Sequence, residues 1–417
     1  MPTKEENDRL TRVGPGTPGG EFMRRYWQPA ALSEELPPGG APIPVRLLGE
    51  DLALFRDESG QPGLLGIHCT HRGADLSYGR IEDGGIRCLY HGWLYDRTGR
   101  CLEQPGEPAG SRFYERIRQP AYPCHEQAGI IFAYMGPGEP PLFPNYEFLT
   151  VPQEYVFATK YHSACNYLQG NEGNFDPQHL SYLHRFLSAG EDFRQAYHAG
   201  DTCPTIDPVE TEFGMHLYAV RKVGAGKHFV KVRSFFMPSG GAVGSRGEAG
   251  YNVNWHVPID DENHWRYSIL FSRDAPIDEG TMRRERTGVA ANYRLERSRA
   301  NRYLQDREEM KTETFIGMGR SFVVHDTWAT EGEGVIYDRT TEHLGYTDRG
   351  IVVMRKLMLQ AIRDVEEGRD PLHVVRDPAR NVYPDLIARD DVLAAGVPWR
   401  NHWKRQSDVP ESAAARA

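Results

Sequence analysis

Short alternating runs of apolar and polar residues, separated by turns, fill the chain from about residue 40 to residue 135. The pattern predicts a hairpin over residues 44–57, a strand, turn and strand over residues 86–96, and a closing strand over residues 129–136. Strands of this length with turn residues between them are typical of a small all-β module. We therefore expect the first domain to be built from β-strands.

Longer alternating runs follow and predict an antiparallel sheet. They lie at residues 155–165, 212–223, 228–238, 251–259 and 264–272. A stretch rich in Gly and Pro precedes them, so we place a domain boundary near residues 136–150. Helices are expected at residues 281–315, rich in Arg and Glu, and at residues 348–367, where an apolar stripe precedes Gly368. The predicted fold class is α+β.

Bulk composition narrows the class of protein. The 417 residues carry a net charge of −9 without a basic block, which argues against nucleic acid or an anionic membrane surface as partner. No apolar run approaches the ~20 residues that span a bilayer, so we expect no membrane association and a cytoplasmic enzyme with a small-molecule substrate. The six cysteines are expected to be thiols or metal ligands, because a chain of this size needs no disulfides.

Paired cysteine and histidine residues mark the first candidate metal site. Cys69 and His71 stand one residue apart, and after sixteen further residues come Cys88 and His91, with two residues between them. A Rieske [2Fe–2S] centre needs two thiolates on one iron and two imidazoles on the other, and each pair offers one of each. Structural zinc accepts the same four residues, but zinc fingers carry their cysteines together and their histidines together. The alternation favours the cluster, with zinc as the alternative.

A second candidate site lies in the segment that contains Asp176, His179 and His184. Two imidazoles and one carboxylate form the ligand set of non-haem iron(II) oxygenases. Histidines five residues apart do not share a face of a regular α-helix, so we expect a locally irregular helix here. The competing interpretation makes the histidines core residues and Asp176 a helix N-cap. The upstream cluster motif favours iron, because a one-electron cluster needs an electron acceptor.

Together the motifs resemble those of the Rieske ring-hydroxylating oxygenases, in the phthalate dioxygenase-like branch that works without a β subunit. The resemblance covers nearly the whole chain and rests on residues 10–30, 69–76, 88–93, 172–184 and 325–348. It implies a small all-β Rieske domain and a larger catalytic domain with a helix-grip-like antiparallel sheet flanked by helices. The implied layout is an N-terminal segment packing on the catalytic domain (1–38), the Rieske domain (39–143), the catalytic iron domain (144–404) and a mobile tail (405–417).

The resemblance also assigns ligands. It implies that the cluster is held by Cys69, His71, Cys88 and His91. It implies that the catalytic iron is held by His179, His184 and a carboxylate late in the chain. Asp326 matches the family pattern for that carboxylate, and Asp338 and Asp348 are its competitors. The chain departs from the pattern at His325, where many relatives are expected to carry Gln or Glu.

In such enzymes the cluster of one subunit serves the iron of the next. The resemblance therefore implies a homotrimer or a hexamer of stacked trimers. Asp176 is expected to link His179 to His91 of the partner subunit.

The implied protein is an oxygenase component that uses O₂ and supplied electrons to oxidise a carboxylated aromatic compound. The reaction is ring hydroxylation, or O-demethylation of a methoxylated lignin-derived aromatic as in dehydrodivanillate O-demethylase. The chain has no dinucleotide fingerprint, so we expect a separate NAD(P)H-dependent reductase with flavin and a plant-type [2Fe–2S] centre, or a reductase plus ferredoxin. The competing function is a Rieske electron-transfer protein without oxygenase activity, which does not account for the residues after the first domain.

Substrate contacts are expected from two groups of residues. The polar residues near the histidine motif that are expected to line the pocket are Ser181, Asn166 and Gln169. The basic residues on alternating strands are Arg221, Arg233, Lys222 and Lys231. A carboxylated substrate needs such a cation, and Arg221 and Arg233 are the candidates we select. The competing interpretation is that these charges face water.

Overall fold

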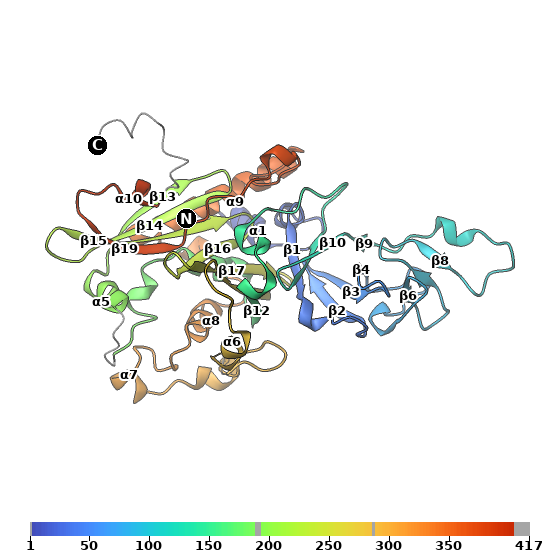
Figure 1. Ribbon diagram of the computed structural model, residues 1–417, viewed down its shortest axis with the longest axis horizontal. Helices are drawn as coiled ribbons and strands as arrows, with labels where there is room; N and C mark the ends of the chain where they lie inside the picture. The colour runs from blue at the N-terminus through green and yellow to red at the C-terminus, as the bar shows by residue number, and fades with distance from the viewer. Residues whose placement is uncertain (1, 188–192, 286–287, 404–417) are drawn as a thin grey trace.

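The two β-rich regions that the sequence predicts lie toward opposite ends of an elongated molecule (Figure 1). The computed structural model describes residues 2–187, 193–285 and 288–403. The predicted mobile tail, residues 405–417, lies outside the described residues. Among the described helices, none has both the length and the apolar character needed to cross a bilayer.

Three small antiparallel sheets form the N-terminal β region. The first has the order β1 (Trp27–Leu32), β11 (Ile130–Tyr134), β10 (Cys124–Gln127). The second has the order β2 (Ile43–Leu47), β3 (Glu50–Arg56), β4 (Pro62–Gly66), β9 (Ala121–Tyr122). The third has the order β5 (Arg80–Glu82), β6 (Gly85–Arg87), β7 (Leu94–Tyr95), β8 (Cys101–Glu103). The predicted hairpin, strand pair and closing strand are confirmed as β2–β3, β6–β7 and β11.

One large antiparallel sheet forms the core of the second region. Its order is β12 (Val156–Ser163), β18 (His264–Ser272), β17 (Gly250–Pro258), β16 (Gly240–Ser245), β15 (Lys227–Phe236), β14 (Gly214–Lys222), β13 (Thr205–Glu210), with β19 (Arg389–Ala394) also paired to β15. The five predicted strands are confirmed. The sequence did not reveal β13, β16 and β19, because β13 contains a proline, β16 is rich in glycine and β19 starts with three charged residues. Pairing with longer neighbours stabilises these strands against weak intrinsic preference.

Helices cover this sheet and connect its strands. They are α1 (Lys4–Thr11), α2 (Pro18–Met23), α3 (Glu147–Thr150), α4 (Tyr167–Asn174), α5 (Phe193–Gly200), α6 (Glu279–Glu285), α7 (Glu309–Thr312), α8 (Phe322–Gly332), α9 (Arg349–Glu366) and α10 (Trp399–His402). The helix predicted at residues 348–367 is confirmed as α9. In the N-terminal segment, α1 and α2 contact α9, whereas β1 pairs with β11. The domain boundaries stay predictions.

The long helix predicted at residues 281–315 is wrong. The described part of this segment contains the short helices α6 and α7 and a 3₁₀ turn at Arg299–Leu304. Between the two helices, Tyr293, Arg302 and Tyr303 have φ values of 61°, 54° and 54°, which an α-helix does not allow. The segment is rich in charge and has no continuous apolar stripe, so its sequence offers no single helix face to bury.

A buried ion network attaches α4 to the C-terminal part of the chain. The carboxylate of Glu172 on α4 lies 2.8 Å from Arg339 Nη2 and 2.6 Å from Arg355 Nε on α9. Arg355 also pairs with Glu342. Burial by itself would raise the pKa of Glu172, but the two guanidinium groups outweigh burial and hold this pKa below its ordinary value. Because buried charges are costly unless paired, the network fixes the position of α4.

We expect Glu172→Gln to lower the free energy of unfolding of the large domain by about 3–5 kcal/mol, because two buried guanidinium groups lose their anion. Asp8→Asn is the matched control, because Asp8 pairs with Lys4 on the surface of α1 and its loss should change stability little. Chemical denaturation followed by circular dichroism measures both variants. Equal destabilisation by the two would contradict the role given to the network.

Candidate functional site

Two loops with the same hydrogen-bond pattern carry the predicted cluster ligands. Cys69 and Cys88 each donate a backbone hydrogen bond of 2.8 Å to the carbonyl five residues later. The glycine four residues after each cysteine, Gly73 or Gly92, donates back to the cysteine carbonyl and has a φ of +75°. Such a φ favours glycine, so the same tight turn forms twice in the chain.

These loops bring the two thiols together and the two imidazoles together. Cys69 and Cys88 are buried, form no disulfide and are close enough for each thiol to influence the other. The ring centroids of His71 and His91 lie 4.4 Å apart. Two thiols beside two imidazoles are the donors that a Rieske cluster requires, so the residues present fit this group.

Aromatic rings cover part of this donor set. Trp93 is buried and stacks on His71, with the ring centroids 4.3 Å apart and the planes within 5°. Tyr90 packs against His91 but remains 56% exposed. Burial raises the pKa of the Cys88 thiol, and the neighbouring cysteine raises it further. The imidazole side of the site therefore lies nearer the surface than the thiol side.

The second histidine motif meets a distant carboxylate after the end of α4. His179 begins a short 3₁₀ turn, His179–Ser181, and His184 lies in the turn that follows, so the two histidines converge through turns where an irregular helix was predicted. One ligand atom from each of His179, His184 and Asp326 lies within 4.8 Å of the others. Asp338 and Asp348 instead accept backbone N–H groups of their own turns. The structure therefore brings Asp326, and not its competitors, to the histidines.

Hydrogen bonds to His184 show which of its nitrogens is free. His325 Nε2 lies 2.7 Å from the carbonyl of Gly319, which can only accept, so Nε2 carries the proton and Nδ1 of the neutral ring is an acceptor. His184 Nδ1 lies 3.1 Å from this acceptor and must donate to it. His184 Nε2 is then left with a lone pair. Burial lowers the pKa of His184 to about 4, so the ring stays neutral near pH 7.

This lone pair faces a carboxylate. His184 Nε2 lies 2.9 Å from Asp326 Oδ1, and Arg266 Nη1 donates to the other oxygen, Oδ2, at 2.9 Å. Burial would raise the pKa of Asp326, but the favourable charges around it, Arg266 among them, outweigh burial and hold this pKa far below its ordinary value. A nitrogen lone pair and a carboxylate oxygen without a proton between them are stabilised by a cation. With two imidazoles and one carboxylate, the residues present fit a mononuclear iron.

Asp176 caps the turn that leads to His179. Its Oδ1 accepts the backbone N–H groups of Gln178 at 2.8 Å and His179 at 3.3 Å. Its other oxygen, Oδ2, lies 3.5 Å from His179 Nδ1. Asp176 therefore makes the capping hydrogen bonds of the competing interpretation, and the same carboxylate is close to the histidine ring.

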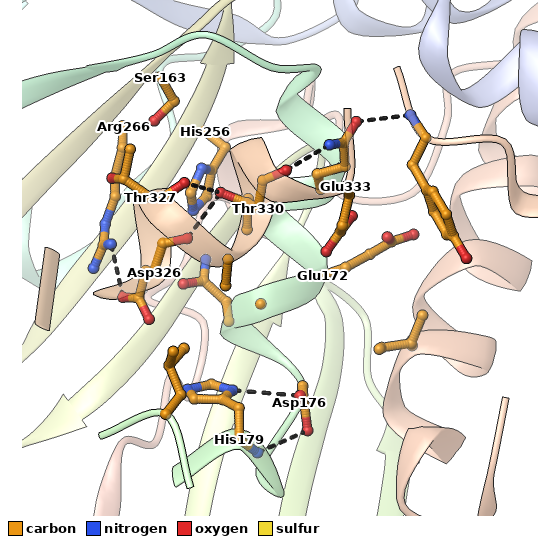
Figure 2. A pocket seen from close by; sticks show the side chains of 18 of the residues that line it. Ser163, Glu172, Asp176, His179, His256, Arg266, Asp326, Thr327, Thr330 and Glu333 are labelled. Atoms are coloured by element: carbon orange, nitrogen blue, oxygen red, sulfur yellow. Dashed lines mark hydrogen bonds and ion pairs between the residues drawn. The ribbon is translucent and has the colours of Figure 1, made fainter. Parts of the chain in front are cut away.

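A cavity of about 370 Å³ opens beside these donors (Figure 2). Asp176, His179 and Asp326 line it. The guanidinium groups among the described lining residues belong to Arg266 and Arg355, and both are already paired with carboxylates. The cavity thus has a polar wall whose strongest charges are neutralised.

Some of the residues predicted to contact the substrate line the cavity, and others do not. Gln169 lines the cavity, whereas Asn166, Ser181, Arg221 and Arg233 do not. Asn166 and the two arginines donate to buried backbone carbonyls, with distances of 2.8 Å for Arg221 to Pro177 and 2.7 Å for Arg233 to Asn174. Buried carbonyls need such donors, so these side chains support the backbone around α4. Their contact with substrate stays a prediction.

Sequence reasoning missed three residues that act around the iron donors. They are His325, Arg266 and His256. His325 was visible as a departure from the family pattern, but its hydrogen bond to His184 was not. Arg266 and His256 lie on alternating strands where the sequence does not reveal which side chains face the cavity.

Comparisons with known proteins agree with this geometry. Residues 26–123 match the family described as "Rieske [2Fe-2S] domain", and residues 133–415 match "LigXa C-terminal domain like". Phenoxybenzoate dioxygenase subunit alpha of Ectopseudomonas oleovorans is 35% identical, over 88% of this chain and 87% of its own. The 5,5'-dehydrodivanillate O-demethylase oxygenase subunit of a Sphingobium species is 34% identical, over 94% of this chain and 88% of its own.

Solved structures share the fold. Dicamba monooxygenase bound to dicamba superposes with a TM-score of 0.60 at 19% identity, covering 84% of this chain and 100% of the other. The reduced complex between oxygenase and ferredoxin in carbazole 1,9a-dioxygenase gives a TM-score of 0.58 at 21% identity, covering 90% and 96%. At these identities the likeness supports the fold alone.

A Rieske domain joined to a larger catalytic domain is the architecture of an oxygenase component with two iron centres. The chain belongs to the Rieske non-haem iron oxygenases and is the oxygenase component of such an enzyme, with phthalate dioxygenase and O-demethylase subunits among its relatives. The resemblance, the fold class and the pair of iron cofactors expected from the sequence are thereby confirmed.

We expect His325→Phe to weaken Fe(II) binding by about 10–100-fold, because His184 loses the acceptor that keeps its proton on Nδ1. His325→Gln retains an acceptor and should restore most of the affinity. Competition against an Fe(II) chelator measures the affinity, and cluster absorbance checks that the Rieske domain is intact. His162→Phe, at a buried histidine that hydrogen-bonds Arg294 instead, is the control. Unchanged affinity in His325→Phe would disprove the role of His325.

Proposed function

We propose which side chains hold the two iron centres of this oxygenase. The cluster ligands are Cys69, His71, Cys88 and His91. The ligands of the catalytic iron are His179, His184 and Asp326. The observation that carries the proposal is the convergence of the last three, within 4.8 Å, at the edge of a cavity. A Rieske electron carrier has no use for such a second donor set.

When bound, the mononuclear iron would supply O₂ activation, and the cluster would supply its electrons. The side chains of this chain position the ligands. His325 keeps the proton of His184 on Nδ1, and Arg266 holds one oxygen of Asp326 so that the other faces the histidines. The cavity holds the substrate next to these donors, where its orientation decides which carbon is oxidised.

We propose an aromatic substrate, oxidised by ring hydroxylation or by O-demethylation. The two named relatives, a dioxygenase subunit and an O-demethylase subunit, support one reaction each. A substrate carboxylate remains our expectation, because Arg221 Nη1 and Arg233 Nε are buried N–H groups without a hydrogen-bond partner among the described residues. Formaldehyde from methoxylated aromatics, compared with diols from unsubstituted ones, distinguishes the two reactions.

We propose that the enzyme works as a homotrimer or as stacked trimers, fed by an NAD(P)H-dependent flavin reductase with a plant-type [2Fe–2S] centre or by a reductase plus ferredoxin. Figure 1 draws β6, which leads into the second cluster loop, and β8 of the same sheet toward one end of the molecule, and draws α8 beneath the large sheet, away from that end. The residues Tyr78, Leu89 and Tyr90 near these loops are 74%, 60% and 56% exposed, an apolar surface suited to a partner. In that assembly Asp176 of this chain would lie between His179 and His91 of the partner subunit, and would link the iron to the neighbouring cluster.

The wild-type chain is expected to contain three irons and two sulfides, one cluster and one mononuclear iron. Asp326→Ala should lose the third iron and keep the cluster, because it removes a ligand from the second centre alone. Metal and sulfide assays, with electron paramagnetic resonance of the reduced protein, measure this. Asp338→Ala, at a turn-capping carboxylate, should keep all three irons. Zinc in place of iron would overturn the proposal.

Asp176→Asn is expected to keep both iron centres and to slow electron transfer between them by about 10–100-fold, because the carboxylate beside His179 is lost while its capping oxygen is retained. Oxidation of the reduced cluster during a single turnover measures this rate. Asp338→Asn serves as the control, since Asp338 caps a separate turn. An unchanged rate would remove Asp176 from the electron path.

A further inference from the structure

A second histidine pair lies in the wall of the cavity. His256 on β17 and His264 on β18 are 3% and 0% exposed. His256 Nδ1 lies 3.0 Å from His264 Nε2, and His264 Nδ1 lies 2.8 Å from the carbonyl of Cys165. His256 lines the cavity, and Figure 2 shows it on the same side as Arg266 and Asp326.

The carbonyl of Cys165 determines where the protons of this pair lie. A carbonyl can only accept, so His264 Nδ1 carries a proton and donates it. Nε2 of the neutral His264 ring is then an acceptor, and His256 Nδ1 must donate to it. The remaining nitrogen, His256 Nε2, therefore has a lone pair and no proton. Burial and the neighbouring His264 lower the pKa of His256 well below its ordinary value, which agrees with a neutral pair.

His256 Nε2 is buried and has no hydrogen-bond partner among the described residues. A second cavity residue, Asn174, has the complementary group: its Nδ2 is buried and lacks a described partner, while its Oδ1 accepts from Asn254 at 3.2 Å. The wall thus contains one unused acceptor and one unused donor. Buried polar groups of this kind are costly unless a ligand or water satisfies them.

The backbone of α4 is shaped around the pair. A Cβ atom at Gly170 would lie 2.4 Å from His256 Nδ1 and 2.8 Å from His264 Nε2. Both distances are too short for any side chain, so α4 can pass over the two rings only with glycine at this position. The pair is therefore held in one arrangement by the helix, by two strands and by a backbone carbonyl.

We propose that His256 Nε2 accepts a hydrogen bond from a hydroxyl group of the aromatic substrate, and that Asn174 Nδ2 donates to an oxygen of the same molecule. The substrate class is then a phenol, including the methoxyphenols that O-demethylation acts on. A carboxylate has no proton to give, and its charge would face the lone pair of His256. The inference rests on the proposed function, because it takes this cavity to be the substrate site.

The test is binding of matched aromatic pairs to the iron-loaded protein under nitrogen, measured by calorimetry. The probes are 4-hydroxy-3-methoxybenzoate against 3,4-dimethoxybenzoate, and 3-hydroxybenzoate against 3-methoxybenzoate. The wild type is expected to bind each phenol about 10–100-fold tighter than its methyl ether, because the ether leaves the buried acceptor unpaired. This comparison needs no variant and does not depend on how a variant folds.

Variants then assign the preference to one side chain. In His256→Phe the phenol and its ether should bind within about threefold of each other, while His256→Gln, which offers an amide oxygen, should keep part of the preference. His162→Phe, at a buried histidine that does not line this cavity, should retain the full preference. A preference that survives in His256→Phe would overturn the assignment to His256.

The outcomes separate this inference from the function on which it rests. Equal binding of phenols and ethers by the wild type, with oxidation of both, would overturn the inference and leave the oxygenase proposal intact. If no aromatic binds and none is oxidised by protein with both iron centres loaded, the proposed substrate site itself is wrong. Tighter binding of the ethers would mean that no hydrogen-bond acceptor faces the substrate hydroxyl. This result would also overturn the inference.

Discussion

The buried carboxylate of Glu172, held between two guanidinium groups, fixes the short helix from which the iron site is built. Helix α4 has eight residues and is buried on nearly all sides, so no apolar stripe alone can define its rotation. Hydrogen bonds between a carboxylate and guanidinium groups are directional, so they can define the rotation of this helix. From this fixed helix the chain leads directly into Asp176 and His179. A rotation of α4 would therefore move the iron donors and the cavity together.

Proton placement in two histidine pairs follows from the same simple constraint. Each pair ends on a backbone carbonyl, that of Gly319 or that of Cys165, and a carbonyl can only accept. Each pair consequently presents one bare nitrogen at its other end. His184 presents it to a carboxylate, where a cation is required, whereas His256 presents it to the cavity, where a hydrogen-bond donor is required. In our proposal the same residue type therefore supplies a metal ligand in one place and a hydrogen-bond acceptor for the substrate in the other.

The two candidate metal sites differ in how far apart in the fold their donor residues originate. The Rieske donors come from two local turns, each closed by hydrogen bonds within six residues, so this site can form with little help from the rest of the molecule. The iron donors come from the end of α4 and from α8, and their partners come from β18 and from α8 itself. This second site exists only in the fully packed large domain. An enzyme of this kind can therefore carry an intact cluster while its catalytic iron is lost.

The sequence by itself determined what is local. Alternation predicted the main strands, and the spacing of Cys69, His71, Cys88 and His91 predicted the cluster, because turn geometry and strand period depend on neighbouring residues. It did not predict that residues 281–315 form short helices in place of one long helix. It also did not predict that Arg221 and Arg233 donate to backbone carbonyls away from the cavity. The family pattern selected Asp326 among three carboxylates, and the tertiary structure brings it to the histidines and decides where their protons lie. The partners, such as His184 and His325, are separated by 141 positions, and only packing of the folded domain brings such groups within hydrogen-bond distance.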